Sequence, residues 1–152
     1  MNKLLMLLLA VIMSCTNAVS QNSKNMQAKG EIIASETQGG AEEAGFKMIK
    51  DQAELQNNIT QNFKKSGMEP VMEIPVFQKD KKVILYNLGT FNSGDHKVNE
   101  IKSISVKDNV LYVEVPEYQS GGMAIQVMSN PWFIFSVPSS YQFNSVELKY
   151  SK

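Results

Sequence analysis

The sequence contains no arginine: its 15 basic residues are all lysine, and they balance 15 aspartate and glutamate residues. Planar, bidentate recognition of phosphates and bases relies on arginine, and nucleic-acid binding draws on an excess of positive charge. We therefore expect no nucleic-acid partner.

Cysteine and histidine are also scarce, with one residue of each, Cys15 and His96. A single thiol cannot form an intramolecular disulfide, so disulfides are not expected to stabilise the fold. A zinc site built from histidine and cysteine needs three or four such ligands. We expect no metal site and no cofactor.

The longest apolar run is short. It comprises the ten residues Leu4–Met13 and follows Lys3, whereas a helix that crosses about 30 Å of hydrocarbon needs roughly 20 residues. A positive residue followed by a short apolar run is typical of a secretory signal peptide. We therefore assign residues 1–20 to a signal peptide and expect an exported protein.

Cys15 lies where the apolar run ends. Ile12-Met13-Ser14-Cys15 resembles the bacterial lipobox, whose cysteine is acylated and becomes the first residue of the mature protein. Several acyl chains anchor a protein firmly, since each buried methylene adds about 0.8 kcal/mol. The chain would then be a lipoprotein of the outer membrane or the periplasmic face. The alternative is cleavage after Ala18-Val19-Ser20, which would free a soluble periplasmic or secreted protein.

Residues 21–30 are almost all polar or small and predict a flexible tether. Residues 31–152 are enough for one domain with a single modest core. Within it, Glu31–Ser35 predicts a weak first strand, and the glycines of Gly39–Gly45 predict a loop.

One helix is predicted after Asp51. Asp51 and Glu54 have the spacing of a capping box, and Gly67 has the position of a residue that ends a helix. Between them an apolar residue recurs every four positions, at Leu55, Ile59 and Phe63, which places all three on one stripe of the helix.

The remainder has the periodicity of strands. Expected strands are Lys82–Leu88, Val98–Val106, Asn109–Val115, Met123–Met128, Trp132–Val137 and Val146–Tyr150. Asp108-Asn109 tolerates the conformation of a two-residue hairpin turn. Leu111, Val113 and Val115 alternate with polar neighbours, which predicts a sheet with one solvated face. We therefore expect an α+β fold, with one N-terminal helix packed on a mainly antiparallel sheet of five to six strands, or a half-open barrel of the same strands.

Catalytic patterns are weak. Ser93-Gly94-Asp95-His96 unites a hydroxyl, an acid and the single histidine, but glycine and aspartate there also suit a turn, and neighbouring strand residues point to opposite faces. Acidic residues show no fixed pair for acid and base roles. We expect no catalytic residues.

Aromatic residues concentrate in Trp132–Phe135. In a strand the two alternating sets face opposite sides, so at least one set should lie in the core. A binding surface is the alternative, because an exposed aromatic patch or strand edge can receive a partner. We take Trp132, Tyr118 and His96 as candidate partner contacts.

The chain resembles the C-terminal-type domain of the PrcB family. The resemblance rests on residues 46–55, Ile74–Phe77, Val83–Gly89, Gly122–Gln126 and Asn130–Pro138, and it spans roughly Glu31 to Tyr150. That family is named for a lipoprotein accessory subunit of a spirochaete surface protease complex. The resemblance implies a non-catalytic envelope module that stabilises or holds another protein, and it supplies no catalytic residues.

The signal peptide, the tether and the resemblance together favour a non-catalytic module that binds a protein partner at the cell envelope, such as a secreted or surface protease. The alternative is a small-ligand or glycan binder with an aromatic sheet surface. A hydrolase, and a protease inhibitor that presents a loop such as 117–122, are further alternatives.

Overall fold

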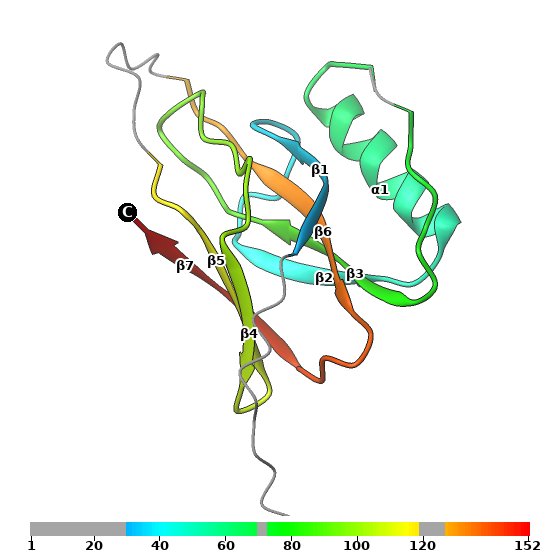
Figure 1. Ribbon diagram of the computed structural model, residues 1–152. Helices are drawn as coiled ribbons and strands as arrows, with labels where there is room; N and C mark the ends of the chain where they lie inside the picture. Colours follow the sequence, from blue (N-terminus) through cyan, green and yellow to red (C-terminus); the bar gives the residue numbers. More distant parts are fainter. Residues whose placement is uncertain (1–29, 70–72, 119–126) are drawn as a thin grey trace, which may run out of the picture.

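A computed structural model describes residues 30–69, 73–118 and 127–152. Cys15, the signal peptide, residues 21–29 of the tether and residues 123–126 of one predicted strand lie outside the described residues. Within them the chain forms seven strands and one helix (Figure 1): β1 (Glu31–Glu36), β2 (Gly45–Ile49), α1 (Gln52–Lys65), β3 (Lys81–Asn87), β4 (Ser103–Lys107), β5 (Val110–Pro116), β6 (Trp132–Pro138) and β7 (Ser145–Ser151).

The strands pair into two sheets. Sheet I has the order β1-β6-β3-β2 and is antiparallel throughout. Sheet II has the order β4-β5-β7, in which β5 and β7 run parallel. Between β5 and β7 the chain leaves sheet II and contributes β6 to the interior of sheet I. This crossover allows the parallel pairing, since adjacent parallel strands cannot be joined by a tight turn.

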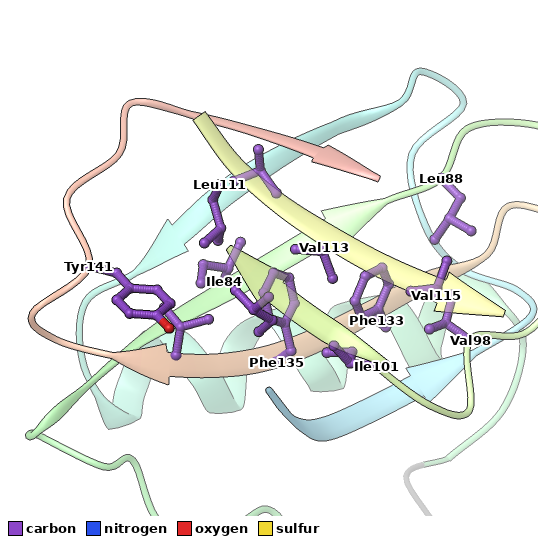
Figure 2. Close-up of a cluster of buried hydrophobic side chains, with 13 residues drawn as sticks. Ile84, Leu88, Val98, Ile101, Leu111, Val113, Val115, Phe133, Phe135 and Tyr141 are labelled. Carbon is purple, nitrogen blue, oxygen red and sulfur yellow. The ribbon is translucent and has the colours of Figure 1, made fainter. Parts of the chain in front are cut away.

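The larger core lies between the two sheets, as Figure 2 shows. Alternate residues of β6 face sheet II, and two of them, Phe133 and Phe135, stack with ring centroids 5.1 Å apart. On the side of sheet II, Leu111, Val113 and Val115 of β5 belong to the same core. The polar residues between these three are half-buried, so the predicted alternation of β5 is confirmed.

A second core lies between sheet I and α1. Helix α1 presents the predicted stripe, Leu55, Ile59 and Phe63, to the other face of sheet I. There it meets Val83, Leu85, Trp132 and Ile134. The structure therefore has three layers, sheet II, sheet I and the helix (Figure 1), and the strand interiors of sheet I are covered on both faces.

The ends of α1 follow the sequence prediction. The Asp51 side chain accepts a hydrogen bond from the Glu54 backbone N–H at 2.8 Å, and the Glu54 carboxylate accepts from the backbone N–H of Lys50 at 2.9 Å. At the other end Gly67 has a φ of 73°, and the N–H of Met68 donates to the carbonyl of Phe63. The helix prediction and both of its end signals are confirmed.

The hairpin between β4 and β5 is also confirmed. Asp108 and Asn109 have φ values of 52° and 62°, which place both residues in the left-handed region that this type of turn requires. The predicted strand Val98–Val106, which leads into this hairpin, is partly wrong, because β4 begins only at Ser103. Val98 and Ile101 are buried without belonging to a strand, and their spacing of three residues does not fit strand alternation.

The predicted α+β fold is wrong. The described residues are mostly β, in two sheets, and the helix follows two strands instead of opening the domain. Strand β2 was missed, since five residues beginning with glycine give a weak signal. The predicted sheet with one solvated face corresponds to sheet II alone. Strand β6 of sheet I is apolar on both faces and needs a layer on each side.

Candidate functional site

A cavity of about 400 Å³ lies where the segment before β4 meets the end of β5 and β7. Three aromatic side chains line it: His96, Tyr118 and Tyr150. Three carboxylate side chains also line it: Asp95, Glu100 and Glu117. The cavity thus combines aromatic surface with charge, and it contains two of the three candidate partner contacts.

A backbone bridge between Phe91 and Ser129 holds one wall in place. The N–H of each residue donates to the carbonyl of the other, at 2.9 and 2.8 Å. The Ser129 hydroxyl also donates to the carbonyl of Ser93. The chain then turns at Gly94 and Asp95, as the sequence predicted, and delivers His96 to the cavity.

Asp95 gathers two hydroxyl groups. Its Oδ1 atom accepts a hydrogen bond from Ser93 Oγ at 2.5 Å and another from the hydroxyl of Tyr118. The bond donated to Asp95 raises the pKa of the Tyr118 phenol, while the hydrogen bond with the Ser93 hydroxyl acts in the opposite direction. Tyr118 is therefore held in one orientation as a neutral phenol at neutral pH.

His96 is packed between two rings. Its ring centroid lies 3.9 Å from that of Phe91, in a stacked arrangement, and 4.5 Å from that of Tyr118. Only 5% of its surface is exposed, and its Nδ1 atom is buried without a hydrogen-bond partner. Burial lowers the pKa of the imidazole, and the negative charge of Asp95 opposes this shift. The ring is therefore neutral at neutral pH.

These contacts do not form a Ser-His-Asp catalytic arrangement. In such a triad the acid bonds to the imidazole Nδ1 and the imidazole bonds to the serine. Here the Ser93 hydroxyl donates directly to Asp95, and the Nδ1 atom of His96 bonds to no group. Ser93 is therefore not placed as a nucleophile that His96 could activate.

Lys97 is the one basic side chain that lines the cavity within the described residues. Its Nζ atom lies 3.2 Å from Oε1 of Glu36. Glu36 does not line the cavity, so it offsets the positive charge of Lys97 from outside. Glu100 and Glu117 are exposed at the rim. The formal charge of the lining is therefore negative.

Trp132 is not a partner contact, which corrects that prediction. Its side chain has no exposed surface; it packs edge-on against Phe63, with centroids 5.9 Å apart, and its Nε1 donates to the carbonyl of Gln38 at 2.8 Å. Sequence reasoning also missed Tyr150 and Glu100. Tyr150 reaches the cavity because β7 pairs with β5 in parallel, which places Tyr150 beside Val115. No local sequence pattern predicts this register.

A second hollow, of about 550 Å³, lies beside the start of α1. Val76 and Phe77 line it, and the side chain of Gln52 fixes this segment by accepting from the Phe77 N–H and donating to the Pro75 carbonyl. Its one carboxylate, Asp51, is engaged as the helix cap. This hollow therefore has fewer polar and charged groups available to a ligand than the cavity at His96.

Within residues 30–69, 73–118 and 127–152, no group of three or more His, Cys, Asp or Glu side chains is placed to hold a metal ion. In the same residues, no helix has the length and apolar character needed to cross a membrane.

Comparison of the chain with protein-family models, curated proteins and solved structures gives no match. The resemblance to the PrcB family stays a prediction from the sequence.

Proposed function

We propose that the chain is a non-catalytic, exported module that binds a protein partner at the cell envelope. The observation that carries the proposal is a cluster of exposed apolar and aromatic side chains around the cavity. Met128 is 67% exposed, Tyr150 49% and Val127 46%, and these are three of the five large exposed hydrophobic residues in the described part of the chain. Exposed apolar groups rimmed by polar ones are typical of protein interaction sites.

Tyr150 and Val127 connect the cluster to the cavity. Tyr150 lines the cavity itself. Val127 adjoins the turn that carries Asp95, since a Cβ atom added at Gly94 would lie 3.5 Å from its Cβ atom. The Gln38 side chain donates to the carbonyl of Met128 at 3.0 Å and so fixes the backbone there. A preformed surface of this kind loses little conformational entropy when it binds.

The non-catalytic part of the proposal draws support from the same residues. Ser93 is the hydroxyl nearest to a histidine and an acid in the sequence, and its hydroxyl donates to Asp95. The imidazole of His96 packs between two rings, stacked on Phe91 and tilted against Tyr118. Neither group is arranged to activate the other.

Envelope attachment depends on Cys15. We expect cells grown with a clickable fatty acid to label the protein, and the Cys15→Ser variant to lose the label. Retained label in that variant, or unlabelled wild-type protein, contradicts the lipid anchor. A soluble exported protein cleaved after Ser20 would leave the partner-binding proposal intact.

Site-specific crosslinking tests partner binding. A photoreactive amino acid at Met128 should yield one defined crosslinked species in the envelope, whereas the same group at exposed Asp80, in the turn before β3, should not. The substitution Val127→Asp should abolish the species formed from Met128. A crosslink pattern that is the same at both positions, or that survives Val127→Asp, contradicts the proposal.

Small-ligand or glycan binding is a second candidate, because the cavity places Tyr118 and Tyr150 along one hollow of ligand size. A ligand that raises the melting temperature of the wild-type protein, but not that of Tyr150→Ala, would favour it over a protein partner.

A further inference from the structure

From the lining of the cavity at His96 we infer that it is a receptor for an organic cation, an alkylammonium or guanidinium group. Three features meet there: the carboxylates of Asp95, Glu100 and Glu117, the rings of Tyr118 and Tyr150, and a hollow of about 400 Å³. The inference rests on the proposed function where the cation is a basic side chain of the partner protein.

The charges of the lining favour a cation. The lining contains three carboxylate side chains and one lysine, Lys97, which is paired with Glu36 at 3.2 Å. Burial keeps His96 neutral, so the imidazole adds no competing positive charge. A cation that enters the cavity therefore meets, at close range, a lining whose formal charge is negative.

The aromatic lining favours an organic cation over a hydrated metal ion. Ammonium and guanidinium groups are attracted to the faces of tyrosine rings within about 6 Å of the centroid. Tyr118 is held by its bond to Asp95, so its ring needs no reorganisation on binding. The same chain already uses such a contact elsewhere, where Lys149 Nζ lies 3.9 Å from the centroid of Tyr112.

His96 is the reporter that the site supplies. It lines the cavity, 5% of its surface is exposed, and its Nδ1 atom is buried without a partner. Because it is the single histidine of the chain, its imidazole gives one unambiguous set of NMR signals. A cation that binds against Tyr118 changes the electric field at His96, whose ring centroid lies 4.5 Å from that of Tyr118.

The direct test is an NMR titration of the purified protein with n-butylammonium chloride, with 1-butanol as the neutral control. We expect a saturable shift of the His96 imidazole signals with the ammonium probe and none with the alcohol. The apparent Kd should rise at least threefold when the salt concentration is raised from about 50 to 500 mM, because the attraction is screened.

Matched variants locate the binding. The double substitution Glu100→Gln and Glu117→Gln should weaken n-butylammonium binding at least fivefold, and Tyr150→Leu at least threefold. Asp80→Asn removes the same charge from an exposed turn outside the lining, and it should leave the Kd unchanged. Trp132 fluorescence, from the single tryptophan, checks that each variant is folded.

Two results overturn the inference: shifts that are equal for n-butylammonium and 1-butanol, and a Kd that is the same in the double variant and in Asp80→Asn. If cation binding fails while the Met128 crosslink persists, the inference falls and the proposed function stands. If n-butylammonium binds and no Met128 crosslink forms, the cavity receives a free organic cation and the protein-binding proposal falls. Loss of the crosslink in the double variant identifies the cation as a side chain of the partner.

Discussion

Three glycines differ in backbone conformation and in the space around them. Substituting each by alanine therefore measures the cost of a positive φ separately from the cost of a steric clash. A Cβ atom at Gly45 would meet no atom within 4 Å, and Gly45 is not among the residues with positive φ. Gly67 is equally open but has a φ of 73°. Gly39 has a φ of 96°, and its Cβ would lie 1.9 Å from the backbone oxygen of Asn62. The three substitutions should therefore differ in order.

The magnitudes follow from these environments. Gly45→Ala should be neutral or stabilise the protein by up to about 1 kcal/mol, because alanine has less freedom in the unfolded chain. Gly67→Ala should destabilise by about 1–2 kcal/mol, the cost of a side chain in the left-handed region. Gly39→Ala carries that cost and also a steric clash of about 1–3 kcal/mol, giving about 2–5 kcal/mol.

Urea unfolding followed by Trp132 fluorescence measures all three free energies of unfolding, since the buried indole becomes exposed when the chain unfolds. The slope of the free energy against urea should stay the same in all variants. The reasoning is refuted if Gly39→Ala is no more destabilising than Gly67→Ala. That result would mean that the loop before β2 does not pack against Asn62 of α1.

Three further predictions concern stability. Asp51→Ala should lower the free energy of unfolding by about 1 kcal/mol, whereas Asp51→Asn should retain most of the cap; equal losses in urea unfolding would contradict the capping role. Trp132→Ala should destabilise by about 3–5 kcal/mol, and a loss below 1 kcal/mol, measured by circular dichroism, would show that the indole is not a core residue. Burial lowers the folded-state pKa of His96 below its ordinary value, so the unfolded state binds more protons and stability should decrease as the pH falls from 7 towards 5; His96→Gln should flatten this part of the profile, and an unchanged slope would exclude His96 as its source.

Local signals were sufficient where neighbouring residues determine the structure. Asp51 and Gly67 mark the ends of α1 because caps are formed within one or two turns, and Asp108-Asn109 marks its hairpin for the same reason. The layer arrangement depends on distant contacts. Phe133 and Trp132 are neighbours in sequence yet belong to different cores, and the sequence alone does not say that both faces of β6 are covered.

The candidate site shows the same division. The turn at Gly94 and Asp95 could be predicted from residue types. The meeting of His96 with Tyr118 could not, since it depends on the bridge between Phe91 and Ser129 and on the pairing of β5 with β7. Concentration of aromatic residues pointed to Trp132, but an apolar strand supplies core residues more readily than surface ones.

Strand β6 has a consequence for the chain before it folds. It carries no charged residue, and six of its seven side chains are buried, so the unfolded segment has the features of an aggregation-prone sequence. Pro131 stands immediately before it, and Pro138 is its last residue; prolines at such borders interrupt intermolecular strand pairing. Replacing either proline should therefore leave a correctly folded molecule that is obtained in lower soluble yield.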